Sequence, residues 1–168
     1  MAGAYDDRDG VIWMDGKLVD WRDAKVHILT HGLHYGSSVF EGERAYNGKI
    51  FKSREHSERL LKSGEYMDIP IPYTVDEIEA AKVEVLAASD LQDAYVRAVC
   101  WRASGEDMGV ASARNPVKMA IAVWEWGAYY GDAKMKGAKL DIAKWKRPSP
   151  ETIPCVAKAA GPYIALLY

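Results

Sequence analysis

Residues 94–101 read Ala-Tyr-Val-Arg-Ala-Val-Cys-Trp, and this stretch decides the fold. It is rich in β-forming residues with partial period-two alternation, which predicts a strand. Because side chains two residues apart on a strand share a face, Tyr95 and Arg97 point the same way as Val99 and Trp101. A guanidinium matches the geometry of a carboxylate, so Tyr95 and Arg97 form a candidate carboxylate receptor. Taken alone, the pair is more typical of a solvent-facing edge arginine beside a core tyrosine.

Two stretches downstream of this strand have the same character, Val117–Trp126 and Lys139–Trp145, and we predict a strand over each. The polar loop Ser104–Pro116 separates the first of them from residues 94–101. After them the chain changes composition, because Arg147–Pro154 contains three prolines and predicts a stiff connector. The Ala-rich segment Cys155–Tyr168 that follows is expected to begin a helix.

These changes in composition predict three parts. Residues 1–146 are expected to form a small α+β lobe, and residues 147–154 an interdomain linker. Residues 155–168 are expected to be the start of a truncated second lobe.

Upstream of residues 94–101, two turn dipeptides predict β-hairpins. Asp15-Gly16 and Asn47-Gly48 each lie between two short apolar runs, the pattern that favours a type I′ turn. The predicted strand pairs are Val11–Met14 with Lys17–Val19, and Glu43–Tyr46 with Lys49–Phe51. We interpret the Gly- and Ser-rich stretch His31–Gly42 between the hairpins as a strand entered through a tight loop.

Two helices are predicted between the second hairpin and the strand at 94–101. Ser53 can cap a helix over Arg54–Met67. Thr74 with Glu77 has the form of a capping box, and apolar residues recur behind it at helical spacing as far as about Ala88. Lys82 falls on the apolar side of this helix, where its stem can pack while its amine reaches water. Strands and helices in segregated runs indicate the α+β class.

Composition excludes several kinds of function. The formal net charge of −2 over 168 residues gives no footprint for nucleic acid or an anionic membrane. No stretch approaches eighteen apolar residues, and Met1–Asp9 lacks the features of a signal peptide, so we expect a cytoplasmic protein. Cys100 and Cys155 form no zinc motif. We expect both to be reduced, and the alternative is a disulfide between them.

Single residues give weaker indications of chemistry. Lys158 lies among small apolar residues, where a desolvated amine could act as a nucleophile, but its spacing alone favours a solvent-facing lysine. Arg59 could bind a phosphate, or pair with Glu55 one helical turn away. The histidines lack the spacing of metal ligands, so we expect no metal site.

Taken together, these features occur in an order that resembles the branched-chain amino acid aminotransferases, which are class IV, fold-type IV enzymes dependent on pyridoxal phosphate. The resemblance runs from Val11 to Tyr163. Seven stretches carry it: Trp21–His27, Leu33–Gly42, Arg54–His56 with Arg59-Leu60, Ala94–Arg97, Met108–Val110, Trp126–Tyr129 and Ala157–Ala159. It implies the N-terminal lobe of the D-amino acid aminotransferase-like fold, with an antiparallel sheet and flanking helices, and a truncated second lobe.

The resemblance also implies roles for particular residues. For the cofactor, pyridoxal 5′-phosphate, it implies Lys158 as the Schiff-base lysine, Arg59 as the ligand of the phosphate and Tyr163 as the partner of the ring oxygen. For the substrate, it implies apolar walls from Phe40, Trp126 and Tyr129, a carboxylate site near Tyr95, an arginine for the side chain of glutamate at Arg97, and residues lent by a partner subunit at Tyr35 and Val110.

The activity implied is ping-pong transamination between Leu, Ile or Val and 2-oxoglutarate in a homodimer, with Lys158 as the acid and base. Because the family's second lobe supplies further cofactor contacts, we expect the 168 residues alone to be incomplete. Two alternatives stay open. One is another fold-type IV enzyme, acting on D-amino acids, simple amines or aminodeoxychorismate. The other is a non-catalytic lobe that dimerises. Tyr95 with Arg97, and the loop Met108–Val110, favour the branched-chain type.

Overall fold

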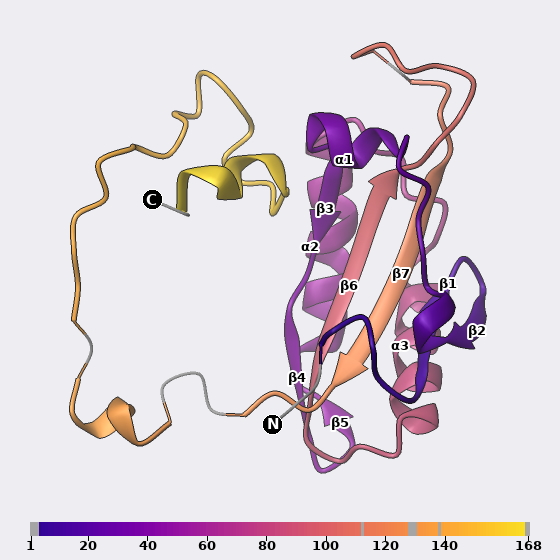
Figure 1. Ribbon diagram of the computed structural model, residues 1–168, viewed down its shortest axis with the longest axis vertical. Coiled ribbons are helices and arrows are strands. Elements are labelled where there is room, and N and C mark those ends of the chain that lie inside the picture. Colours follow the sequence, from indigo (N-terminus) through magenta and orange to yellow (C-terminus); the bar gives the residue numbers. More distant parts are fainter. Residues whose placement is uncertain (1–3, 112, 128–130, 138, 167–168) are drawn as a thin grey trace.

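The computed structural model describes residues 4–111, 113–127, 131–137 and 139–166, and a seven-stranded antiparallel sheet forms its centre (Figure 1). The strands lie in the order β2-β1-β7-β6-β4-β5, and β3 also pairs with β6. Their bounds are β1 (Val11–Met14), β2 (Lys17–Asp20), β3 (Ser38–Phe40), β4 (Glu43–Tyr46), β5 (Lys49–Ile50), β6 (Ala94–Arg102) and β7 (Val117–Trp124).

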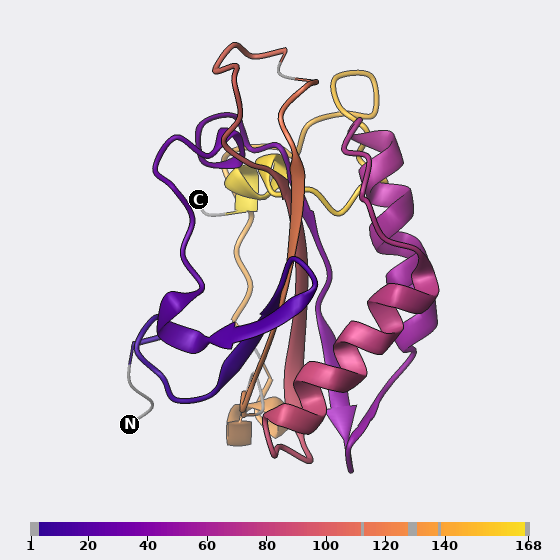
Figure 2. The ribbon, with the colours of Figure 1, turned by 90° about the vertical axis from the view of Figure 1, so that its right-hand side faces the viewer.

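Two long helices, α2 (Ser53–Tyr66) and α3 (Val75–Ala88), cover one face of this sheet (Figure 2). The core lies between them and the sheet, where Leu60, Ile78 and Val96 are fully buried. The remaining helices are short: α1 (His31–Tyr35) and the 3-10 turns η1 (Trp21–Asp23), η2 (Gly131–Met135) and η3 (Gly161–Leu166). The expected α+β class, with an antiparallel sheet and flanking helices, is therefore confirmed.

Local sequence signals predicted both hairpins and the second long helix correctly. Asp15-Gly16 and Asn47-Gly48 adopt positive φ at all four residues, as a type I′ turn requires. At the start of α3, Thr74 Oγ1 accepts a hydrogen bond from the amide of Glu77, and Glu77 Oε2 accepts one from the amide of Thr74. The capping box is thus present in full.

Two short strands share one edge of β6. Phe40 of β3 lies opposite Val99, and Glu43 of β4 lies opposite Val96. Between them, the amide of Glu41 donates to the carbonyl of Ala98 at 2.8 Å, so the backbone stays attached where the chain passes from β3 to β4. This passage turns the Glu41 side chain into the protein, where it is fully buried.

Two expectations for the N-terminal part need correction. Ser53 does not cap α2; it is the first helical residue, and its hydroxyl donates to Glu79 of α3 at 3.0 Å. The stretch His31–Gly42 is not one strand, because α1 occupies its first half. Gly36 ends α1 in the left-handed conformation, which glycine adopts without strain, and β3 begins two residues later.

Two expected strands also differ from the structure. β7 ends at Trp124 rather than Trp126, and Lys139–Trp145 forms no strand. Leu140 and Ile142 are more than nine-tenths exposed. A strand needs a neighbour for its backbone groups, and both edges of β7 are already paired, with β1 and β6.

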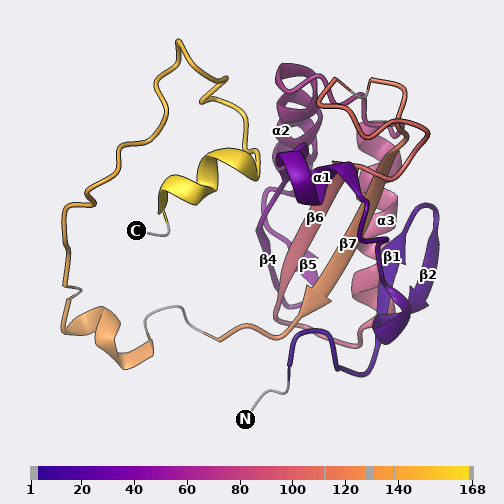
Figure 3. The same ribbon diagram turned by 45° about the horizontal axis from the view of Figure 1, so that its top comes forward.

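The expected helix over residues 155–168 is also wrong in its first half. Ala159 forms an isolated antiparallel bridge with Val39, and η3 begins only at Gly161. Pro154 and Pro162 leave few residues between them for an α-helix. The chain leaves the sheet after β7 and returns to it through this bridge (Figure 3).

Among the described residues, none of the helices combines the length and the apolar character that a membrane-spanning helix needs. Cys100 and Cys155 are both free thiols. Burial raises the pKa of the Cys100 thiol, which keeps it protonated.

Candidate active site

The amine of Lys158 lies at the centre of a small aromatic cluster. Its Nζ donates a hydrogen bond to the hydroxyl of Tyr163 at 2.9 Å and lies 4.9 Å from the ring centroid of Phe40. The rings of Phe40 and Tyr163 are themselves 5.0 Å apart. The structure thus brings together three residues that the sequence analysis had selected from two distant segments.

The backbone of Lys158 is held on both sides. Its carbonyl accepts a hydrogen bond from the amide of Phe40 at 3.0 Å, and its amide donates to Ser63 Oγ at the same distance. One residue beyond the bridge, the amide of Ala160 donates to the carbonyl of Ser38 at 2.9 Å. The lysine therefore lies on an extended segment added to the edge of β3, and not on a helix.

Arg59 of α2 makes a bidentate ion pair with Glu41. Its Nε lies 2.6 Å from Glu41 Oε1 and its Nη2 lies 2.7 Å from Oε2. His56, one turn earlier on α2, contributes a third contact to the same carboxylate at 2.8 Å. The suggested pairing of Arg59 with Glu55 does not occur, because Glu55 pairs with Lys52.

The carboxyl group of Glu41 has a lowered pKa. Its complete burial alone would raise that pKa, but the hydrogen bonds from Arg59 and His56 outweigh the effect of burial. Glu41 is therefore a fixed negative charge that orients Arg59. The Arg59 side chain remains about half exposed, and its Nη1 has no hydrogen-bond partner in the part of the chain that the structure describes.

Arg97 and Tyr95 share a face of β6, as predicted from their spacing. Arg97 Nη2 donates to the hydroxyl of Tyr95 at 2.9 Å, and the guanidinium carbon lies 4.8 Å from the Phe40 ring centroid. Arg97 Nε is buried with no hydrogen-bond partner among the described residues. An arginine with a buried, unused donor beside an aromatic wall is suited to receive an anionic group.

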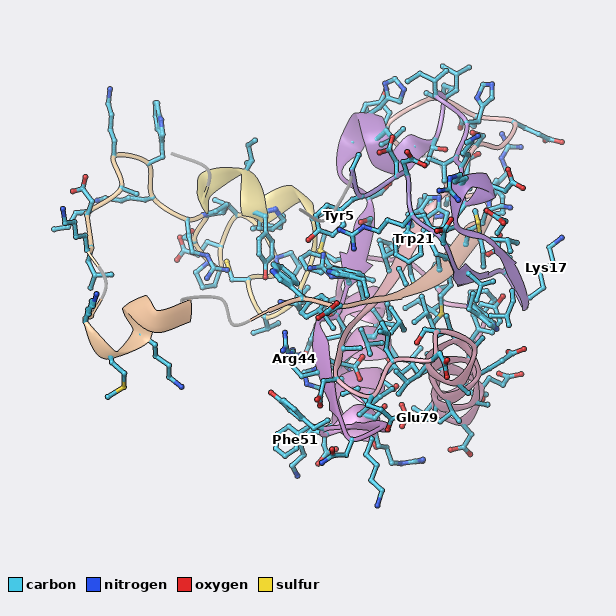
Figure 4. All side chains as sticks on the ribbon, turned by 60° about the horizontal axis from the view of Figure 1, so that its bottom comes forward. Tyr5, Lys17, Trp21, Arg44, Phe51 and Glu79 are labelled. Atoms are coloured by element: carbon cyan, nitrogen blue, oxygen red, sulfur yellow. The ribbon has the colours of Figure 1, made fainter. Side chains whose placement is uncertain are left out.

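Aromatic residues extend this wall beyond Tyr95. Its ring meets that of Trp126 edge-on at 4.6 Å, and Trp124 stacks on Trp126 at 5.9 Å. Arg44 of β4 donates to the carbonyl of Trp126 at 2.6 Å and so fixes the chain just after β7; Figure 4 labels this arginine. Trp126 therefore lies beside Tyr95 as a residue of the same wall.

An apolar cavity of about 450 Å³ lies against alternate residues of β6, which point away from the core residues Val96 and Ala98. Arg97, Val99 and Trp101 of β6 line it, together with Ala122 of β7 and Ala160. Its volume is in the range typical of small-molecule sites. A cavity with apolar walls and one arginine can receive both an apolar and an anionic side chain.

Tyr35 is bonded to the loop that carries Val110. Tyr35 donates from its hydroxyl to the carbonyl of Met108 at 3.1 Å, and Val110 is three-quarters exposed. In the described part of the chain, neither forms a hydrogen bond with Lys158. Tyr129 lies outside the described residues.

Residues 4–111, 113–127, 131–137 and 139–166 contain no group of three or more His, Cys, Asp or Glu side chains that could hold a metal ion. The buried histidine His31 instead contacts Ser37 Oγ at 2.7 Å and the carbonyl of Gly109 at 3.2 Å. It therefore connects α1 to the loop that carries Val110.

Sequence reasoning missed three residues of this region, Glu41, His56 and Ser63. All of them act on residues that it did select, since Glu41 and His56 contact Arg59 and Ser63 holds the backbone of Lys158. A signal was available for Glu41 and His56, because both lie inside stretches that carry the resemblance, Leu33–Gly42 and Arg54–His56.

The sequence of this region matches the family model of amino-transferase class IV over residues 38–166. The chain belongs to the class IV aminotransferase family. It is 43% identical over 163 residues to a branched-chain-amino-acid aminotransferase of Pseudomonas aeruginosa, covering 94% of this chain and 53% of that protein.

Solved structures give the same result for the fold. A branched-chain amino acid aminotransferase of Escherichia coli superposes with a TM-score of 0.86 at 36% identity, covering 95% of this chain and 54% of that one. The T.th. branched-chain amino acid aminotransferase, solved in complex with N-(5′-phosphopyridoxyl)-L-glutamate, also gives 0.86 at 36% identity, over 94% and 52%. The fold is therefore that of the fold-type IV enzymes, and the chain spans about half the length of these relatives.

Proposed function

We propose that this chain forms the N-terminal half of a pyridoxal-phosphate-dependent transaminase. It would exchange the amino group between a branched-chain L-amino acid, Leu, Ile or Val, and 2-oxoglutarate. The observation that carries the proposal is the Lys158 amine held against Tyr163 and Phe40, in a chain 43% identical to a branched-chain enzyme. The phosphopyridoxyl-glutamate complex of the T.th. relative supports both the cofactor and the glutamate half of the exchange.

The residues present suit the cofactor at its phosphate and at its aldehyde. Arg59 has a half-exposed guanidinium that Glu41 already orients, and its Nη1 has no partner among the described residues, which suits a phosphate group. Lys158 Nζ lies beside a phenol that can also hydrogen-bond the cofactor's ring oxygen. We therefore assign the phosphate to Arg59, the aldehyde carbon to Lys158 and the ring oxygen to Tyr163.

The proposed substrate site combines the aromatic wall of Phe40, Tyr95 and Trp126 with the cavity that Arg97 lines. Phe40 and Trp126 would contact the apolar side chain of Leu, Ile or Val, and Tyr129 would join them. Tyr95 would lie near the substrate carboxylate. Arg97, whose buried Nε is unused within the described residues, would bind the side-chain carboxylate of glutamate at the edge of the same cavity.

When bound, pyridoxal phosphate supplies an electron sink that stabilises negative charge at the substrate Cα. Lys158 Nζ would remove the proton from the substrate Cα, acting as a base. It would then deliver this proton to the carbon on the far side of the transferred nitrogen, acting as an acid. Tyr163 would hold the amine in place through its hydroxyl, and Phe40 would exclude water from one side.

We also propose that the full-length protein is a homodimer in which Tyr35 and Val110 face the partner's site. The exposure of Val110, and the contacts that join its loop to α1, support an interface role. The proposed division of the chain places the small lobe at residues 1–146, a linker at 147–154 and the start of the cofactor-lysine lobe at 155–168.

The test is reductive trapping in the full-length protein. Incubation with pyridoxal phosphate, borohydride reduction and peptide mapping should give one phosphopyridoxyl adduct, on Lys158, and Lys158→Ala should abolish it together with turnover. An adduct on Lys144 or Lys146 would contradict the assignment. The absence of any adduct would favour a non-catalytic dimerising lobe, and turnover of D-amino acids or simple amines in place of leucine would favour another fold-type IV enzyme.

A further inference from the structure

Ser63 of α2 forms a hydrogen bond with Lys158 that no local feature of the sequence predicts. Its Oγ accepts the Lys158 amide at 3.0 Å, from a position ninety-five residues earlier in the chain. The Ser63 side chain is buried, with 1% of the residue exposed. This part-buried hydrogen bond supplies the acceptor of the Lys158 amide, so it favours one position of the Lys158 backbone.

The other side of Lys158 is attached to a different element. The amide of Phe40 in β3 donates to the Lys158 carbonyl, and the Val39–Ala159 bridge continues this pairing. The bonds to β3 hold the segment from the sheet. The hydrogen bond to Ser63 of α2 holds its amide from the helix layer as well, so the position of Lys158 depends on both elements.

Arg59 lies on the same helix, four residues before Ser63. Residues four apart occupy the same face of an α-helix, one turn and about 6 Å apart along the axis. The bidentate pair with Glu41 fixes the guanidinium of Arg59 at its end of this turn. One rigid helical turn therefore joins the group assigned to the phosphate and the group that holds the backbone of Lys158.

We propose that Ser63 is a positioning residue that sets the spacing between the Arg59 guanidinium and the Lys158 amine. This inference rests on the proposed function, in which a phosphorylated aldehyde engages both groups at once. Simultaneous engagement at two ends strengthens binding only when the spacing of the sites matches the ligand. Ser63 would therefore matter for an aldehyde that carries a phosphate and little for one that does not.

The experiment compares pyridoxal phosphate with pyridoxal, which has the same aldehyde and ring but no phosphate. Cofactor-free full-length protein is titrated with each, and the lysine-bound form is followed by its absorbance and confirmed by reduction and mapping to Lys158. Ser63→Ala should weaken the apparent affinity for pyridoxal phosphate about tenfold, because a displacement near 1 Å is enough for losses of this size. The affinity for pyridoxal should change less than about twofold.

Ser57→Ala is the matched control. Ser57 lies on the same helix and is equally buried, but its hydroxyl contacts Lys82 and Glu79 instead of the Lys158 segment. Its removal should lower the melting temperature without changing the ratio of the two affinities. Should Ser63→Ala not fold, Ser63→Cys keeps a small side chain with a weaker acceptor and should shift the ratio in the same direction.

Amide hydrogen exchange gives a second readout that needs no cofactor. In the cofactor-free protein, the Lys158 amide should exchange faster in Ser63→Ala than in the wild type or Ser57→Ala. The positioning role would be overturned if the Lys158 amide exchanged at an unchanged rate, or if the apparent affinities for both aldehydes fell equally. Either result would leave the proposed function intact. A wild-type protein that forms no reducible adduct on Lys158 with either aldehyde would overturn the proposed function, and this inference with it.

Discussion

Lys82 of α3 and Glu43 of β4 form an ion pair that is shielded from solvent. The amine lies 2.9 Å from each carboxylate oxygen, and the two side chains are 1% and 0% exposed. Ser57 accepts a further hydrogen bond from the amine at 2.7 Å, and Glu79, labelled in Figure 4, lies 3.3 Å from it. The amine of Lys82 thus turns inward, contrary to the expectation that it reaches water.

Removal of Lys82 should destabilise the protein strongly, because it leaves the Glu43 carboxylate buried without a counter-charge. We expect Lys82→Met to lower the free energy of unfolding by about 3–5 kcal/mol, and the double variant Lys82→Met/Glu43→Leu to recover most of that loss. Urea denaturation measures both. Lys62→Met removes an exposed pair with Glu65 and should cost less than about 1 kcal/mol. If Lys82→Met and Lys62→Met lowered the free energy of unfolding by similarly small amounts, the buried pair would not stabilise the fold in this way.

The stabilising effect of Glu41 should depend on pH. Its folded pKa lies below the ordinary value of 4.5 because its bonds to Arg59 and His56 outweigh burial. Its contribution is therefore fully present above pH 4.5 and is lost as the pH falls through the folded pKa. Glu41→Gln should lower the free energy of unfolding by about 1.5–3 kcal/mol at about pH 7, and by less in acid.

Denaturant unfolding of both proteins near neutral pH and at about pH 3.5 checks this dependence on Glu41. Glu55→Gln removes the charge of an exposed carboxyl on α2, the helix of Arg59 and His56, and should change stability little at either pH. A Glu41→Gln deficit that is the same at both values would show that its charge is not what stabilises the fold.

Because Gly42 has no side chain, the Tyr95 hydroxyl can occupy the space next to its Cα. A Cβ at this position would lie 2.0 Å from that hydroxyl and 2.9 Å from the ring carbon next to it. We expect Gly42→Ala to displace Tyr95, break its hydrogen bond with Arg97 and cost about 1–3 kcal/mol of stability. Thermal unfolding measures the loss. Gly127→Ala meets no atom within 4 Å and serves as the control; equal melting temperatures for the two variants would disprove the clash.

On the proposed function, Arg97 should distinguish glutamate from leucine as a substrate of the full-length protein. Arg97→Ala is expected to reduce kcat/KM for glutamate and 2-oxoglutarate about a hundredfold, because a buried carboxylate that loses its cation costs about 2 kcal/mol or more. The loss for leucine should stay below about tenfold, since its side chain carries no charge. Steady-state kinetics with both amino acids decide the question. Arg54→Ala, an exposed arginine paired with Asp76, is the control, and equal losses for both substrates would make Arg97 structural.

Local chemistry in the sequence was enough for the elements whose signals lie within a few residues. The hairpins at Asp15-Gly16 and Asn47-Gly48 require positive φ, and the capping box at Thr74 satisfies its own backbone groups, so neither depends on distant parts of the chain. The same reasoning failed at Lys139–Trp145, because β-forming residues make a strand only where another strand is free to pair with them.

For the candidate site, the sequence selected Lys158, Arg59, Arg97 and their aromatic neighbours through the order of seven short stretches. It also placed Tyr95 and Arg97 on one face, since the period of a strand is fixed by its backbone. Tertiary structure decided what holds these residues: Ser63 at the amide of Lys158, and Glu41 at the guanidinium of Arg59. Those partners are ninety-five and eighteen residues away, and a buried polar group takes whichever partner the packed fold brings to it.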